Sequence, residues 1–354
     1  MQEWTGCPPE VEVWAQETGA LIRKRRVGDV ETLIRLALVH SSGLSLRETS
    51  AWAQEHGIAD FSDVALLKRL RKLPKLLTLC VQALLPSPQS GPRLFILDGS
   101  CVSRPIAKGT DFRIHLGWDP SGLRISQVRL SGPKPRESLQ SLPWVAGSVV
   151  IGDRAYGYRG EIAAAQADGV DVLVRLTLSS LPLQGSDGSR IDLLQTCRPL
   201  AVGEVLELDV KTVPDLRKGI TCVPGRFIAI RKDPAIAQRE RIKAKREATK
   251  KKRKQRPETG ESAEFLFLFT TLNREELDAA AVLAAYRHRW QIEMLFKRAK
   301  GIVGLDNIQA RDPDLAATVI LAKLVAILLV QKIQEAFSPW GYALPRKAQP
   351  MAGA

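Results

Sequence analysis

Two short apolar runs, each ended by an aspartate, set the strongest limit on how this chain can fold. Leu94–Leu97 precede Asp98, and Val149–Gly152 precede Asp153. Continuous apolar runs of this length, bounded by small residues, are typical of strands that are buried on both faces of a sheet. An acid at the exit of a central strand lies where open sheets place their functional sites. The simpler alternative is that each aspartate only caps a turn.

A third acid, Glu293, lies in a stretch with helical periodicity that extends from Tyr286 to Lys300. On one helix of 3.6 residues per turn, the polar and aromatic residues of this stretch share a face, and the apolar residues gather on another arc. The polar face consists of Tyr286, Arg289, Glu293, Lys297 and Lys300. This pattern predicts one carboxylate among cations, beside an aromatic ring. A solvated face with ion pairs four residues apart is the alternative.

Taken together, the three acids predict a metal site. Asp98, Asp153 and Glu293 are far apart in the sequence, and three carboxylates cannot stay ionised side by side without a counter-ion. Oxygen ligands of this kind favour the hard cations Mg²⁺ and Mn²⁺. Carboxylates that hold a cation, with basic side chains nearby to hold phosphates, are what metal-assisted phosphoryl transfer on a nucleic acid requires.

The same residues carry a family resemblance. The three acids resemble those of the DDE transposases of bacterial insertion sequences. The spacing Tyr286-x2-Arg289-x3-Glu293-x6-Lys300 is similar to the Y-R-E-K motif of the IS-four-type cut-and-paste group, and the segment 153–157 looks like that group's second motif. The likeness extends over about residues 93–335.

The resemblance implies a reaction and a role for each residue. It implies a ribonuclease-H-like core in which Asp98, Asp153 and Glu293 hold two divalent ions, Mg²⁺ or Mn²⁺. A water molecule nicks the transposon end and frees a 3′-hydroxyl, which then attacks the opposite strand or a target phosphate. The residues that are expected to contact DNA are Tyr286, Arg289, Trp290, Lys297, Lys300 and Arg154.

The family also forms a hairpin intermediate in which one base is flipped out and stacked by aromatic side chains. Its stacking tryptophan lies on the strand before the motif helix, where this sequence has Phe265. Phenylalanine can stack on a base, so Phe265 is a further candidate DNA contact. The alternative is that Phe265, Phe267 and Phe269 form a strand face packed into the core.

The charge of the chain favours a polyanionic partner. The formal net charge is +14, and Arg239–Arg256 alone contains eleven Lys or Arg against two Glu. We expect double-stranded DNA as the partner, both the inverted-repeat ends of an insertion sequence and the target. Coupled cutting of two ends implies a homodimer in a synaptic complex, and no membrane is expected to take part.

Two other functions remain open at this stage. A structure-selective nuclease on the same fold would share the three acids, although it has no need for Tyr286 and Arg289 at these spacings. A non-catalytic DNA-binding regulator derived from a transposase would keep the basic surface, although the retained acids argue against it.

The N-terminal part is patterned as helices. Ser45–Gly57 has the signature of a capped helix, and a second helix is expected at about 62–72, with cations at Lys68, Arg69 and Arg71. Two such helices joined by a glycine turn make residues 1–86 a candidate DNA-binding domain with a helix-turn-helix.

The rest of the chain has the pattern of an interrupted α/β core. Strands are expected at about 94–98, 112–118, 123–130 and 148–152, and the 140 residues from Asp153 to Glu293 exceed a simple connection. The predicted fold is therefore a ribonuclease-H-like mixed sheet interrupted by a β-rich insertion with strands near 190–193, 204–211 and 226–231. The expected divisions are 93–178 (core, first part), 179–263 (insertion, with the basic run 239–256), 264–337 (core, second part) and 338–354 (disordered tail).

Cysteines and apolar segments agree with this prediction. The five cysteines lack a CxxC pair, so neither a disulfide framework nor a zinc site is expected. No apolar leader is visible at the start. Ala316–Val330 contains Lys323 and falls short of a membrane span, so we expect a buried core helix there. The predicted compartment is the bacterial cytoplasm, at the nucleoid.

Overall fold

The computed structural model describes residues 8–24, 27–87, 94–134, 137–250 and 257–337, which fall into two compact units. Unit 1 combines the N-terminal helices with Cys101–Arg113 and the chain from Phe296 onward. Unit 2 combines residues 94–100 with Ile114–Leu295. The predicted tail 338–354 and the end of the basic run, 251–256, lie outside the described residues.

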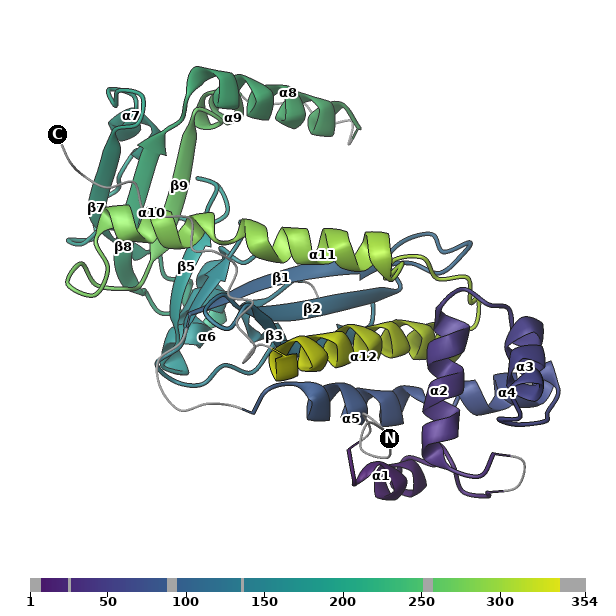
Figure 1. The fold of residues 1–354 in the computed structure, drawn as a ribbon. Coiled ribbons are helices and arrows are strands. Elements are labelled where there is room, and N and C mark those ends of the chain that lie inside the picture. The colour runs from purple at the N-terminus through teal and green to yellow at the C-terminus, as the bar shows by residue number, and fades with distance from the viewer. Residues whose placement is uncertain (1–7, 25–26, 88–93, 135–136, 251–256, 338–354) are drawn as a thin grey trace. The chain divides into compact units, whose positions relative to one another are not determined.

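Unit 1 is built around the long helix α12, which packs against α2 and α5 (Figure 1). Ala316, Ile320 and Leu324 on α12 are at most 1% exposed. The helix is long and apolar enough to cross a membrane, but 61% of its apolar window is buried inside the protein. It is therefore the core helix that the sequence predicts. The helices of unit 1 are α1 (Val11–Glu17), α2 (Val30–Ser41), α3 (Leu46–Glu55), α4 (Asp63–Leu70), α5 (Pro74–Leu84) and α12 (Pro313–Phe337).

The two helices predicted after Ser45 and Ser62 are confirmed as α3 and α4. Ser45 and Glu48 form a reciprocal capping box at the start of α3, and the Ser62 side chain accepts a hydrogen bond from the Ala65 N–H at the start of α4. Such caps satisfy N–H groups that the first helical turn leaves without partners. Arg71, beyond the end of α4, forms an ion pair with Asp312 within unit 1.

In unit 2, the described strands form one mixed sheet with the order β3-β2-β1-β4-β5-β9-β8-β7-β6. β1, β4 and β5 are parallel neighbours, and β9, β8, β7 and β6 continue the sheet in antiparallel pairs. The chain is thus a mixed α/β protein, which confirms the predicted class and is consistent with a ribonuclease-H-like transposase core. The strands are β1 (Leu94–Val102), β2 (Phe112–Asp119), β3 (Arg124–Ser131), β4 (Val149–Gly152), β5 (Asp171–Arg175), β6 (Leu183–Gly185), β7 (Val205–Thr212), β8 (Pro224–Arg231) and β9 (Phe265–Thr270).

Helices and short turns connect these strands. The apolar faces of β4, β5, β8 and β9 share one buried cluster with α6 and α7. Its largest fully buried side chains include Tyr156, Phe227 and Phe269. The connecting elements are η1 (Leu139–Ser141), α6 (Arg159–Ala167), α7 (Leu193–Cys197), η2 (Leu216–Lys218), α8 (Pro234–Lys250), α9 (Pro257–Ser262), α10 (Ala279–Arg287) and α11 (Trp290–Ile302).

The strand predicted near 190–193 is wrong. Arg190 makes only an isolated bridge with Gln184, and α7 begins at Leu193. The cause is local, because the Asp192 side chain accepts a hydrogen bond from the Gln195 N–H and so starts a helix there. The short strand β6 at Leu183–Gly185 is the one that pairs with β7 instead.

The single helix predicted from Tyr286 to Lys300 is also wrong. α10 ends at Arg287, His288 and Arg289 form a turn, and α11 begins at Trp290. The N–H groups of His288, Arg289 and Gln291 each bond three residues back rather than four, which tightens the chain at this point. Tyr286 and Glu293 therefore lie on different helices, with Arg289 between them.

Candidate functional site

The first two predicted acids lie on neighbouring parallel strands. Asp98 lies within β1, which continues to Val102, rather than at a strand exit as predicted, whereas Asp153 directly follows β4. In the register of β1 on β4, Ile96 is opposite Ile151. Continued by two residues, this register brings Asp98 beside Asp153. Neighbouring strands are about 4.8 Å apart, so the two carboxylates lie close together. The electrostatic influence of Asp153 on Asp98 agrees with this placement.

The pKa of Asp98 reflects its burial and its acidic neighbour. The pKa of Asp98 is raised to about 7, mainly by burial and also by the charges of Asp153 and Glu137, against the lowering influence of the Gly99 N–H and Arg289. The Gly99 N–H donates to Asp98 Oδ1 over 2.8 Å. The net upward shift means that Arg289 does not fully compensate the half-buried Asp98 carboxylate beside Asp153, and a divalent cation would supply further positive charge.

Glu137 is an acid of this site that the sequence did not point out. A Cβ atom built on Gly99 would lie 3.3 Å from Glu137 Oε1, so the Glu137 carboxylate lies against the backbone that follows Asp98. The chain is fixed one residue later, where Ser138 and the Leu139 N–H both donate to Glu161. Glycine at position 99 thus makes room for a further carboxylate beside Asp98.

The third predicted acid has a different partner. Glu293 Oε1 accepts a hydrogen bond of 2.5 Å from Arg289 Nη2, and the Glu293 side chain is 54% exposed. Within the described ranges, no group of three or more His, Cys, Asp or Glu residues is placed to hold a metal ion. The structure therefore brings Asp98 and Asp153 together and pairs Glu293 with a cation of its own motif.

Arg289 connects Glu293 electrostatically to the acid pair. Its charge lowers the pKa of Asp98, and Asp153 in turn raises the pKa of Arg289, against the lowering effect of burial. Its guanidinium lies 5.8 Å from the centre of the Tyr286 ring, and its buried Nε has no hydrogen-bond partner in the described part of the chain. Arg289 thus has a donor to spare beside the two aspartates.

The remaining aromatic residues of the motif differ in exposure. Tyr286 is buried, which raises its pKa, whereas Trp290 is 57% exposed. The first turn of α11 is tied to β2, because Trp118 Nε1 donates to Gln291 Oε1 over 3.0 Å. Trp290 thus presents an exposed indole on an anchored turn.

The lysines of the motif lie farther along α11, in unit 1. Lys297 is exposed, and the ammonium of Lys300 lies 3.9 Å from a carboxylate oxygen of Asp306. Unit 1 also holds Lys323, whose Nζ donates to the carbonyls of Gly304 and Asn307 and thereby fixes the turn that ends α11.

Phe265 lies in the hydrophobic core of unit 2 rather than on an open surface. It is 2% exposed, its ring stacks on Phe267 at 5.7 Å between centres, and the Arg231 guanidinium lies over the Phe265 ring at 5.6 Å from its centre. One edge of Phe265 lines a cavity of about 150 Å³ that Arg154 and Arg175 also line. This geometry agrees with the packed strand face that was the alternative for this residue.

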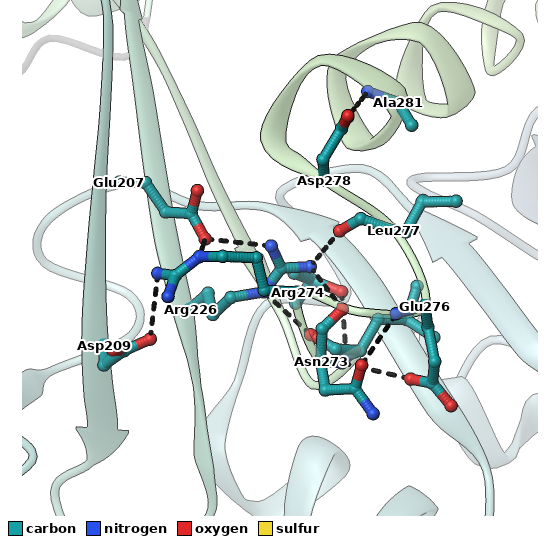
Figure 2. A network of polar contacts seen from close by, with 11 residues as sticks. Glu207, Asp209, Arg226, Asn273, Arg274, Glu276, Leu277, Asp278 and Ala281 are labelled. Atoms are coloured by element: carbon teal, nitrogen blue, oxygen red, sulfur yellow. Dashed lines mark hydrogen bonds and ion pairs between the residues drawn. The ribbon is translucent and has the colours of Figure 1, made fainter.

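A buried arginine on β8 anchors the loop that leads into α10. Figure 2 shows Arg226 bonded to Glu207, to the carbonyl of Asn273 and, at 2.7 Å, to the carbonyl of Leu277. Its Nε also donates to the Leu272 carbonyl. The loop ends at Asp278, which caps α10 through the Ala281 N–H. The position of Tyr286 on α10 thus depends on Arg226.

Comparison with known proteins identifies the family. A family model described as the transposase DDE domain matches residues 89–329. The chain belongs to the DDE transposase family. It is 36% identical over 338 residues to the transposase of insertion sequence element IS421 from Escherichia coli, which covers 93% of this chain and 91% of that protein. It is equally similar, over 337 residues, to the InsL protein of insertion sequence element IS186A from Escherichia coli strain K12.

Among solved structures, the transposase is similar to a chain in the cryo-EM structure of a piggyBac transposase synaptic complex with hairpin DNA. That likeness has a TM-score of 0.42 and 10% identity, over 98% of this chain and 78% of that chain. The predicted DDE transposase of the IS-four type is therefore confirmed through its insertion-sequence relatives, and with it an enzyme of DNA transposition. The family implies use of a divalent metal, which the crowded Asp98–Asp153 pair fits.

Proposed function

We propose that this transposase cuts and joins DNA at the inverted-repeat ends of an insertion sequence, with Asp98, Asp153 and Glu293 as its catalytic acids. The observation that carries the proposal is the strand register that sets Asp98 beside Asp153, with the Asp98 pKa raised to about 7 next to Arg289. A carboxylate pair of this kind is suited to hard divalent cations such as Mg²⁺ or Mn²⁺. Two such ions are the number we propose.

Each residue has a task that follows from its surroundings. Asp98 and Asp153 would hold the cation at the edge of the sheet, and Glu293 would join them by leaving Arg289. A divalent cation, when bound, stabilises the attacking and leaving oxygens of an in-line displacement at phosphorus. Arg289 would then turn its guanidinium to a DNA phosphate, because such forks bind phosphate oxygens in pairs.

The reaction itself is a displacement at phosphorus. The oxygen of a water molecule forms a bond to phosphorus at the transposon end, the bond to the 3′ oxygen breaks, and that oxygen takes up a proton as the 3′-hydroxyl. The oxygen of this hydroxyl then loses its proton and forms a bond to a phosphorus of the opposite strand or of the target, and the 3′ oxygen of the attacked strand leaves and takes up a proton. Exposed Trp290, with Tyr286, Arg154, Lys297 and Lys300, would position the DNA.

The division of the chain that we propose follows the predicted boundaries. Residues 1–86 would form a DNA-binding domain in which α3 and α4 act as a helix-turn-helix, and 179–263 an insertion between two parts of the core, 93–178 and 264–337. We propose a homodimer in a synaptic complex and a place at the bacterial nucleoid. A role for Phe265 in stacking on a flipped base has less support, because the residue is 2% exposed.

One assay tests the proposed reaction. The protein is incubated with Mg²⁺ or Mn²⁺ and a duplex that carries the inverted repeats flanking its gene. Cleavage at the ends, which releases a 3′-hydroxyl, is the expected result. Cutting of branched DNA without regard to sequence would favour a nuclease, and binding without any cleavage would favour a regulator.

The Arg289–Glu293 pair makes a second prediction. Glu293→Gln removes cleavage but is expected to strengthen binding of a duplex about 2–5-fold, because it frees the Arg289 guanidinium from an exposed ion pair worth up to about 1 kcal/mol. Binding is measured by fluorescence anisotropy without divalent ions. Glu276→Gln, which removes an exposed acid from the loop before α10, is the control, and equal affinities for the two variants would contradict the proposed exchange.

A further inference from the structure

A basic cavity adjoins the acid pair on the next strand of the sheet. In the register of β4 on β5, Gly152 is opposite Val174, so Asp153 is followed across the sheet by Arg175. Arg175 also influences the pKa of Tyr286, together with Asp153. It lines the cavity of about 150 Å³ with Arg154, Lys243 and Glu240. The row Asp98, Asp153, Arg175 thus leads from two acids directly to a group of cations.

One carboxylate oxygen of the cavity lining accepts hydrogen bonds from two cations. Glu240 Oε2 accepts from Arg175 Nη2 at 3.0 Å and from Lys232 Nζ at 2.8 Å. Lys232 Nζ donates in addition to the Ala263 carbonyl over 2.9 Å, and its side chain is only 10% exposed. A single oxygen that receives a guanidinium and an ammonium has the surroundings of a phosphate oxygen.

The balance of charge around Glu240 is unequal. Among the residues that line the cavity, Glu240 is the one acid beside the cations Arg154, Arg175 and Lys243, and Arg154 also acts on Lys232. Burial raises the pKa of Glu240, yet its bonds from Lys232 and Arg175 bring the net pKa below the usual value. Burial lowers the pKa of Lys232. The successive phosphates of a DNA strand, each with one negative charge, would compensate more of these cations than one carboxylate does.

The helix that carries Glu240 is otherwise weakly attached. Where the side chains of α8 are described, Ala237 is its one buried residue. Beyond Glu240, α8 is held by Arg241, which contacts Glu264 and the Gly260 carbonyl. A helix that is polar on nearly all sides gains little from burial and depends on such polar contacts. Loss of the Glu240 contacts would therefore free much of α8.

We propose that Arg175 and Lys232 form a subsite for a DNA backbone phosphate, and that Glu240 fills this subsite until DNA displaces it. The inference rests on the proposed function, because the DNA strand at Asp98 and Asp153 is what brings a phosphate to Arg175. Displacement would release α8, whose cations Lys243, Lys245 and Arg246 would then be available to the same DNA. Glu240 is thus an internal competitor of the substrate.

The test compares two isosteric variants of the full chain. Glu240→Gln removes the competing charge, and Glu261→Gln is the matched control, since it breaks an ion pair with Arg198 and changes the net charge equally. We expect Glu240→Gln to bind a duplex of arbitrary sequence about 3–10-fold more tightly, against at most about 2-fold for the control. We also expect the logarithm of its affinity to fall more steeply with salt, by a slope of about one.

Two further arms locate the effect. The gain should disappear in Arg175→Met/Glu240→Gln, because the phosphate then loses its guanidinium. Inorganic phosphate, added at constant ionic strength, should not reproduce the effect of the duplex if the subsite binds a DNA phosphate, and strong competition by it would assign the subsite to the free ion. Faster tryptic cleavage within α8 of Glu240→Gln, at an unchanged melting temperature, is the second readout.

Failure of this inference is distinguishable from failure of the proposed function. The binding measurements contain no divalent ion and require no cleavage. If Glu240→Gln binds no more tightly than Glu261→Gln, the competitor role is overturned even when the wild type cuts transposon ends. If the affinity gain is present but the ends are not cut, the subsite stands and the proposed reaction falls.

Discussion

Replacement of Asp98 or Asp153 by asparagine is expected to reduce cleavage of transposon-end DNA by at least about 10³-fold. Loss of a residue that only orients a metal ligand costs on the order of 10–100-fold, so loss of a ligand itself should cost more. Asparagine keeps the size of the side chain and one oxygen, but it removes the negative charge that binds the cation. The measurement is single-turnover cleavage of a labelled end in Mg²⁺.

The same variants should keep their fold and their affinity for DNA. Burial and Asp153 oppose the ionisation of Asp98 in the folded state. The ionised Asp98 side chain therefore destabilises the fold, and Asp98→Asn should leave the melting temperature unchanged or raise it. Asp209→Asn is the control for a lost carboxylate, because Asp209 lies on β7, four strands from β4 in the sheet order. A variant of Asp98 that retains a tenth of the wild-type rate would remove this residue from the catalytic site.

The pair Asp98–Asp153 was predictable because its signal is local on both strands. Each aspartate follows a continuous apolar run, and these runs become neighbouring parallel strands, although β1 continues past Asp98 to Val102. Arg175 carries the same signal, since it ends the buried run Val172–Val174. A single cation at a strand end does not by itself indicate a metal site, so this signal did not mark Arg175.

Other parts of the site have no local signal. Glu137 reaches Asp98 because the next two residues are held by Glu161, a contact across 22 residues that no periodicity records. The break between α10 and α11 falls at His288 and Arg289, which are both acceptable in a helix, so it is set by tertiary contacts such as that from Trp118 to Gln291. Sequence patterns describe faces of elements and leave such contacts open.

Electrostatics explains where the motif departs from its expected arrangement. The spacing of Arg289 and Glu293 is four residues, which permits an ion pair as readily as it permits a shared role at a metal. In the structure, the partner of Glu293 is the Arg289 guanidinium. The basic run 239–256 likewise had no apolar face to reveal the helix α8, whose contacts depend on single acids such as Glu240.

Replacement of Arg226 by methionine is expected to destabilise unit 2 by about 3 kcal/mol or more, because loss of one partner of a buried ion pair typically costs 3–5 kcal/mol. The Arg226 side chain is 4% exposed and makes bonds to Glu207 and to three carbonyls of the loop before α10. Methionine fills a similar volume but donates nothing. Thermal unfolding should therefore show a fall on the order of 10 °C in the melting temperature.

Arg274 provides the matched control, because it contacts the same carboxylate oxygen of Glu207 at 2.9 Å but is 56% exposed (Figure 2). Arg274→Met should cost at most about 1 kcal/mol, as exposed ion pairs do. Arg226→Lys should fall between the two, since it keeps the charge but cannot reach Glu207, Leu272 and Leu277 at once. Equal melting temperatures for Arg226→Met and Arg274→Met would mean that the loop into α10, and with it Tyr286, is held by contacts other than this arginine.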